Sequence, residues 1–132
     1  MQELERAAAV APIDAVQPPL SVLNLSAAAE IAWADRHGTG VIAYSPLHSG
    51  LLTGTFTTAR AQALADDDGR RTHPDFTRDL AADLRVVDRL RTVADRRGVA
   101  VGSVAIAWAL AWPGVSGAIV GARTPDQTGS WH

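Results

Sequence analysis

The chain has 132 residues, a formal net charge of −2 and no cysteine. This length fits one domain that buries a sizeable core, and the missing cysteine excludes disulfides, thiolate nucleophiles and cysteine-based metal sites. All 12 basic residues are arginines scattered along the chain, so no basic stripe indicates nucleic-acid binding. No apolar stretch reaches the ~18 residues of a membrane span, and the amino end lacks a signal peptide. We therefore expect a cytoplasmic protein without nucleic-acid or membrane partners.

The first part of the chain predicts a helix, a strand, a second helix and a second strand. Residues 2–10 are strong helix formers with acidic residues at the front. The run at 13–17, stopped by two prolines, is typical of a short strand. Ser26 is a suitable N-cap for a helix over 27–37. The apolar run 41–44 then predicts a strand that is buried on both faces, as in a parallel sheet.

A polar loop follows that second strand. Ser45 and Pro46 close the strand because proline cannot donate to a ladder hydrogen bond. The loop continues to Gly54 with two glycines and several hydroxyl or imidazole side chains. Barrels of alternating strands and helices hold their ligands at the carboxyl ends of the strands. This loop is therefore the first candidate site.

The second part of the chain begins with residues 55–77, which predict an exposed, turn-rich loop. Thr77 is a candidate cap for a long helix that ends near Arg97, with one buried stripe formed by Leu80, Leu84, Val87, Leu90 and Val93. Three further elements follow: a helix over 103–111, a strand over 117–120 and a short helix beginning at Pro125, with Thr124 as its cap.

The order of these elements predicts an α/β fold with a parallel sheet. A closed eight-stranded barrel needs about 250 residues. The three expected strands and the 132 residues therefore account for only part of such a barrel.

Four stretches, in this order, together resemble an aldo/keto reductase. They are Gln17–Pro19, residues 40–47 with 49–54 (GVIAYSPL and SGLLTG), residues 105–110 (AIAWAL) and residues 120–127 (VGARTPDQ). The resemblance implies a (β/α)8 TIM barrel, of which residues 1–127 form the carboxyl-terminal half with the last three strands. Residues 128–132 are expected to be a disordered polar tail.

The resemblance also implies an NADP(H) cofactor and a role for each matching residue. Gln17 would hydrogen-bond the nicotinamide carboxamide, and Tyr44 would stack on the nicotinamide ring. The pyrophosphate and adjoining ribose would lie on Ser45, Leu47, Ser49 and Leu51. The adenosine 2′-phosphate would be held by Gly121, Ala122, Arg123, Thr124 and Gln127. Taken alone, a residue such as Tyr44 is more often an ordinary strand-end aromatic residue, and Arg123 is by default a surface arginine.

The chain departs from the family in its catalytic residues. The catalytic Asp, Tyr, Lys and His of the family lie in the amino-terminal half, whereas this chain has no lysine and one tyrosine, Tyr44. Ser130 and Trp131 occupy positions where the family has a Glu-Asn pair. We therefore expect no catalytic residue here, and a truncated oxidoreductase that is inactive alone.

Two alternatives stay open at this point. The chain could be a non-catalytic module that binds NADP(H) or dimerises through open sheet edges. It could also be the complementing half of a split reductase. Because no two of the four histidines are four residues apart, we expect no metal site, and we expect His48 to be solvent-exposed.

Overall fold

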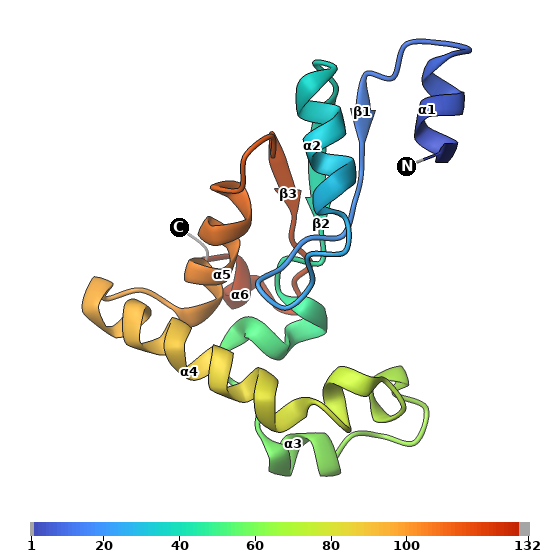
Figure 1. The fold of residues 1–132 in the computed structure, drawn as a ribbon. Coiled ribbons are helices and arrows are strands. Elements are labelled where there is room, and N and C mark those ends of the chain that lie inside the picture. The colour runs from blue at the N-terminus through green and yellow to red at the C-terminus, as the bar shows by residue number, and fades with distance from the viewer. Residues whose placement is uncertain (1, 130–132) are drawn as a thin grey trace. The chain divides into compact units, whose positions relative to one another are not determined.

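A computed structural model describes residues 2–129 of the chain, with three parallel strands and helices between them (Figure 1). The strands are β1 (Ala15–Val16), β2 (Gly40–Tyr44) and β3 (Gly117–Ile119). The helices are α1 (Gln2–Ala8), α2 (Ala28–Arg36), α3 (Thr58–Gln62), α4 (Leu80–Arg97), α5 (Val101–Leu110) and α6 (Pro125–Gly129). Short 3₁₀ helices span His48–Thr53, Gly69–Arg71 and Pro74–Phe76. The α/β class and the parallel sheet predicted from the sequence are confirmed.

The chain divides into two compact units. The first unit contains the residues up to Pro46 together with Ile106–Gly121, and therefore the whole sheet. The second unit contains Leu47–Ala105 together with the residues from Ala122 onward. Helix α4 and the three 3₁₀ helices belong to this second unit.

The sheet of the first unit has the order β1-β2-β3, with β2 in the centre (Figure 1). Val16 pairs with Val41 on one side of β2, and Tyr44 pairs with Ile119 on the other. A side-chain hydrogen bond adds to the backbone pairing of β1 and β2. The Thr39 hydroxyl, just before β2, donates to the Ile13 carbonyl, which precedes β1, at 2.9 Å. A strand with neighbours on both sides fits the continuous apolar run of its sequence.

The core of the first unit lies between α2 and the sheet. Ile31 and Ala34 of α2 are fully buried, as are Val41 and Ala43 of β2. Ala109 of α5 belongs to the same cluster. Because the side chains of a strand alternate between its two faces, Val41 and Ala43 share one face of β2.

Two of the three helix caps predicted from the sequence, Ser26 and Thr77, are wrong. Ala27 precedes α2 without a side-chain cap, and the Ser26 amide donates to the Asn24 side chain at 3.0 Å. Asp79 precedes α4, also without a side-chain cap. The Thr77 hydroxyl instead donates to the His73 carbonyl at 3.0 Å. In both places a local turn uses the polar groups that were expected to cap the helix.

Helix α4 buries one face in the second unit, largely as its periodicity predicts. Leu80, Val87, Leu90 and Ala94 are buried, whereas Val93, which was expected in the stripe, is 36% exposed. Residue 94 lies closer to the helix face of Leu90 than residue 93 does, because the helical repeat is nearer to four residues than to three. The helix ends at Arg97, as predicted, and Gly98 follows it with a left-handed φ of 65°.

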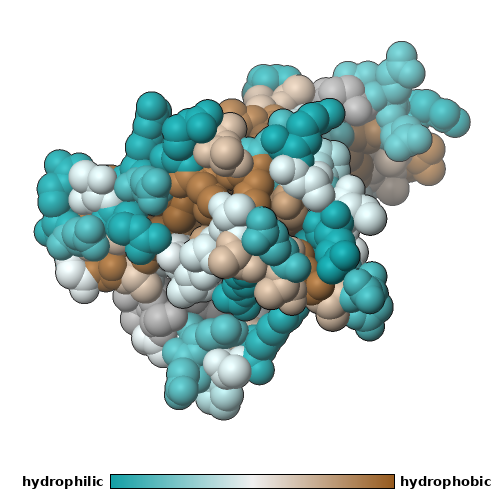
Figure 2. Space-filling view, turned by 90° about the horizontal axis from the view of Figure 1, so that it is seen from below, coloured by the Kyte–Doolittle hydropathy of each residue, from teal (hydrophilic) through white to brown (hydrophobic). Residues whose placement is uncertain are grey.

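The segment predicted to be an exposed loop has a small core of its own. Phe56 and Phe76 are buried and meet edge to face, with ring centroids 5.1 Å apart. Leu64 is buried as well. Hydrophilic residues dominate the face seen in Figure 2 and surround its apolar patches. The aromatic pair therefore gives the turn-rich segment a fixed structure that its charged sequence does not suggest.

The carboxyl end was predicted to be a disordered tail from residue 128. Helix α6 includes Thr128 and Gly129, and residues 130–132 lie outside the described part of the chain. Within residues 2–129, no helix is both long and apolar enough to cross a lipid bilayer.

Candidate functional site

Tyr44 is the last residue of the central strand, and its backbone is fixed from one side by the segment after β1. Its amide donates to the Pro18 carbonyl at 3.0 Å, and its carbonyl accepts from the Leu20 amide at 3.1 Å. Its side chain remains 42% exposed. A held backbone with an accessible ring is what a stacking platform for a flat heteroaromatic ligand requires.

The first unit brings Tyr44 together with three other predicted site residues. Gln17 follows β1, Ser45 follows β2 and Gly121 comes shortly after β3, and all three are exposed. Since the strands are parallel, their carboxyl ends meet at the same edge of the sheet. An amide, an aromatic ring and a hydroxyl group thus lie along this one edge.

The loop after β2 has an uncommon backbone. Ser45, His48 and Ser49 have positive φ angles of 56°, 48° and 53°, although none is a glycine. Each such residue costs about 1 kcal/mol or more, and positions of this kind cluster at functional sites. Leu47, with φ −93° and ψ 4°, precedes left-handed His48. This right-handed then left-handed succession is the geometry in which backbone amides form an anion-binding concavity.

The side chains of the loop divide into buried and exposed ones. Leu47 and Leu51 are buried in the second unit, so only their backbone groups are available to a ligand. Ser49 is exposed. The alternation lets leucines anchor the loop in the core while the residues between them remain accessible.

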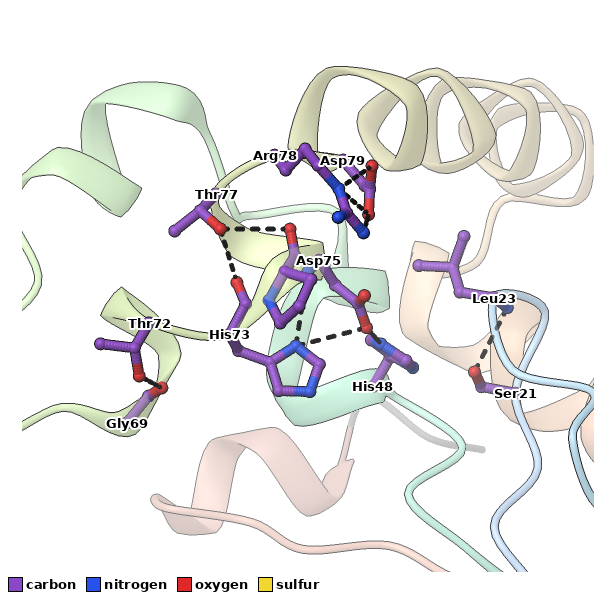
Figure 3. A network of polar contacts seen from close by, with 11 residues as sticks. Ser21, Leu23, His48, Gly69, Thr72, His73, Asp75, Thr77, Arg78 and Asp79 are labelled. Carbon is purple, nitrogen blue, oxygen red and sulfur yellow. Dashed lines mark hydrogen bonds and ion pairs between the residues drawn. The ribbon is translucent and has the colours of Figure 1, made fainter.

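His48 is not the solvent-exposed residue that the sequence predicted. Its Nε2 atom is hydrogen-bonded to the Asp75 carboxylate, and its side chain is only 12% exposed. The same carboxylate also lies 3.5 Å from Nδ1 of His73, and Figure 3 shows the three side chains pointing toward one another. The partner is 27 residues away, so no local pattern could have revealed the pair.

Helix α4 adds a further carboxyl group near this cluster. Burial raises the pKa of Asp83, and the negative charge of Asp75 raises it further, while His48 acts in the opposite direction. The Asp75 carboxylate therefore disfavours the ionisation of Asp83.

Arg70 connects the turn-rich segment to the loop after β2. Its guanidinium binds the Asp68 carboxylate through Nε at 2.9 Å and Nη2 at 2.5 Å. It lies over the rings of Phe56 and Phe76, at 5.8 and 6.0 Å from their centroids. Its Nη1 atom reaches the Ser49 carbonyl at 3.4 Å. Arg70 could not be singled out from the sequence, because Ser49 and Phe56 lie far from it along the chain.

Asp68 lies in the segment that was predicted to be an exposed loop. Hydrogen bonds from the Arg70 side chain and amide hold the pKa of Asp68 well below its usual range. The charge of Arg123 acts on Asp68 in the same direction.

The final motif of the chain, residues 120–127, enters helix α6, which begins at Pro125 as predicted. The backbone amide of Arg123 donates to Oε1 of Gln127 at 2.7 Å, which closes the turn before the helix. Ala122, Arg123 and Thr124 are exposed in the second unit. The Arg123 guanidinium is thus presented on a turn that Gln127 stabilises.

A metal centre has no basis in the part of the chain that the structure describes. Among residues 2–129, no group of three or more His, Asp or Glu side chains is arranged to hold a metal ion. The described site residues offer amides, hydroxyl groups, an aromatic face and guanidinium groups, which suit an organic anion.

Comparisons with known proteins agree with this chemistry. A sequence profile of the aldo/keto reductase family matches residues 1–130. Aldo-keto reductase str7 from Strobilurus tenacellus is 37% identical over 113 residues, which are 82% of this chain and 33% of that protein. A probable voltage-gated potassium channel subunit beta from Arabidopsis thaliana is 36% identical over 70% of this chain and 28% of its own length.

A solved structure extends the likeness to the fold. The glycerol dehydrogenase AKR11B4 from Gluconobacter oxydans superposes with a TM-score of 0.87 at 30% identity. The match covers 98% of this chain and 39% of that enzyme. It agrees with the expected partial (β/α)8 barrel, and the chain spans well under half the length of each of these proteins.

Proposed function

Because the chain belongs to the aldo/keto reductase family, we propose that it is the NADP(H)-binding, carboxyl-terminal part of such an oxidoreductase. The family membership implies a nicotinamide cofactor in general. The preference for NADP(H), the individual contacts and the lack of activity in isolation belong to the proposal.

The observation that carries the proposal is the backbone of the loop after β2. Three non-glycine residues in left-handed conformation within five positions cost stability and call for a functional reason. A pyrophosphate supplies that reason, because it takes hydrogen bonds from backbone amides. Ser45 and Ser49 add exposed hydroxyl groups beside these amides.

The other contacts follow from the chemistry of each exposed group. The Tyr44 ring would stack on the nicotinamide, and the Gln17 amide would pair with its carboxamide. Arg123 would bind the adenosine 2′-phosphate, for which a guanidinium is the natural charge-assisted partner. When bound, the nicotinamide supplies or accepts the hydride. The residues of this chain bind and orient it.

Carbonyl reduction also needs a proton donor beside the reacting oxygen. The sequence contains one tyrosine, which is assigned here to stacking, and no lysine. The relatives are about three times as long as the region they share with this chain. We therefore propose that the chain alone binds the cofactor but does not turn over a carbonyl substrate.

Titration of the purified chain with NADPH and, in parallel, NADH tests the cofactor. Saturable quenching of intrinsic fluorescence by NADPH is expected. Arg123→Gln should weaken NADPH binding about tenfold, as for a lost charged hydrogen bond, and leave NADH binding unchanged. Tyr44→Ala should weaken both nucleotides, whereas Tyr44→Phe should retain the stacking and bind like the unchanged chain.

Arg97→Gln serves as the matched control, since Arg97 is an exposed arginine in the last turn of α4. Its NADPH affinity should equal that of the unchanged chain. The proposal fails if millimolar NADPH gives no saturable signal, or if Arg123→Gln and Arg97→Gln behave alike.

A second candidate role, as the complementing half of a split reductase, is favoured by the edges of the sheet. Among the described residues, β1 and β3 each pair only with β2. Edge strands of this kind recruit further strands. The test mixes this chain with the amino-terminal part of a family member and follows NADPH oxidation with a simple aldehyde. Gel filtration of the chain alone then distinguishes a complementing half from a module that pairs with itself.

A further inference from the structure

The turn-rich segment of the second unit contains a pocket that the nucleotide proposal does not use. It lies between α3, the 3₁₀ helix at Pro74–Phe76 and the start of α4, and it measures about 320 Å³. That is the volume of about ten water molecules, at the lower limit of known ligand pockets. The pocket is therefore too small for a dinucleotide and suits a compact molecule.

The inner wall of the pocket is apolar and fixed. Phe76, which is 4% exposed, and Leu80 are both buried and contribute to its lining. The Phe76 ring is held edge-on by Phe56 and is covered by the Arg70 guanidinium. An aromatic ring that is already immobilised loses little entropy when a ligand packs against it.

Arg71 supplies a cation to the lining. Its Nη1 atom donates to the Leu64 carbonyl at 2.7 Å, which fixes the direction of the guanidinium. Its ion pair with Asp66, at 3.4 Å, is weak because the Asp66 side chain is 99% exposed to solvent. The neighbouring Arg70, in contrast, is already neutralised by two short bonds to Asp68. Arg71 thus keeps N–H donors available for an incoming anion.

Polar side chains complete the lining beside Arg71. Thr58 and Gln62, both on α3, line the pocket and are exposed. Within residues 2–129, neither side chain makes a hydrogen bond. A hydroxyl group and an amide in this state can bind a second polar group of a ligand.

We propose that this pocket binds a small organic carboxylate with a compact apolar body. The carboxylate lies on the Arg71 guanidinium, whose planar fork matches it, and the apolar body packs on Phe76 and Leu80. A single cation above an apolar wall suits a monocarboxylate better than a phosphate ester, which would require several donors around it.

The test uses the full chain labelled with ¹⁵N and three probes: phenylacetate, its neutral analogue phenylacetamide and inorganic phosphate. Phenylacetate has about ten non-hydrogen atoms and so matches the volume. Saturable shifts are expected at the Nε–H signal of Arg71 and at the amides of Phe76 and Thr77. Phenylacetamide should bind about tenfold more weakly, and phosphate should not saturate.

Two arginine variants and a control complete the design. Arg71→Gln should lower the affinity for phenylacetate about tenfold, and Arg71→Lys should lower it less. Arg97→Gln, on an exposed face of α4, should not change it. Dispersed amide signals show that each variant is folded, and Thr58→Val gives a second variant at the rim if Arg71→Gln unfolds.

The proposal is overturned if phenylacetamide binds as well as phenylacetate, or if both arginine variants at position 71 bind like the unchanged chain. It is also overturned if the Phe76 amide is not dispersed, since the pocket then does not exist in solution. The NADPH titration without a carboxylate present tests the other site, because no residue of the pocket is assigned to the nucleotide.

Discussion

The imidazole of His48 and the carboxylate of Asp75 are hydrogen-bonded although 27 residues separate them. His48 begins the 3₁₀ helix of the candidate phosphate loop, and Asp75 lies in the 3₁₀ helix before α4. Both belong to the second unit. The pair therefore connects the loop to the turn-rich segment at one of the loop's left-handed residues.

A double-mutant cycle measures how much this pair contributes to the free energy of unfolding. We expect a coupling of about 1–2 kcal/mol between His48→Ala and Asp75→Ala, because the pair is partly buried and carries charge. Urea denaturation of the four proteins gives the value. The matched cycle with His73→Ala should give less than about 0.5 kcal/mol, since that imidazole is largely exposed. Equal couplings would contradict the assignment.

Gly54→Ala should destabilise the chain strongly. Gly54 has φ 82°, and a Cβ atom placed there would lie 2.7 Å from Cβ of Val101. Left-handed strain and overpacking together predict a loss of about 3 kcal/mol in the free energy of unfolding, measured by urea denaturation.

Gly50→Ala is the matched control for that substitution. Gly50 also has a positive φ, of 91°, but the nearest atom to an added Cβ is Nη1 of Arg70 at 4.0 Å. Only the backbone strain applies, so a loss of about 1 kcal/mol is expected. A Gly54→Ala variant as stable as Gly50→Ala would refute the steric argument.

Thr39→Val should lower stability in the first unit by about 1–2 kcal/mol. The Thr39 hydroxyl is buried and donates to the Ile13 carbonyl. Valine has the same shape but no hydroxyl group, so the carbonyl loses this hydrogen bond. Thr92→Val, at an exposed position of α4, should stay within about 0.5 kcal/mol of the unchanged chain. Thermal unfolding followed by circular dichroism would show the difference, and equal melting temperatures would speak against it.

Asp68→Asn should destabilise the chain in a pH-dependent way. Because the folded-state pKa of Asp68 is lowered, its carboxylate contributes stability above about pH 4, and this stability is lost as the pH falls through the folded-state value. The difference in urea midpoint between variant and unchanged chain should therefore be largest near neutrality and shrink in acid. Asp67→Asn, at an exposed neighbouring position, is the control and should show only a small difference. A constant difference for Asp68→Asn would exclude the charge effect.

The sequence predicted the sheet well and the loop contacts poorly. The apolar run 41–44 and the bounding glycine and prolines act locally, so strand β2 and its parallel neighbours could be placed from them. The first strand is shorter than predicted, with only Ala15–Val16 in regular pairing before the prolines.

Interactions between distant residues account for what was missed. His48 finds Asp75, and the guanidinium of Arg70 reaches the Ser49 carbonyl, 21 residues away. The left-handed φ angles of Ser45 and Ser49 were also beyond prediction, because serine does not favour that region and the surrounding fold imposes it. Local propensity cannot predict a backbone conformation that a residue disfavours and that the surrounding structure imposes.

The Phe76 ring forms part of the proposed carboxylate pocket and also lies under Arg70, which touches the Ser49 carbonyl. Only the Phe76 ring and the Arg70 guanidinium thus lie between the proposed carboxylate and the proposed nucleotide. If both ligands prefer the same placement of this pair, the binding of one raises the affinity for the other, and thermodynamic linkage makes the effect equal in both directions. A small carboxylate in the pocket would then act on nucleotide binding through this pair alone, since the two proposed sites share no residue.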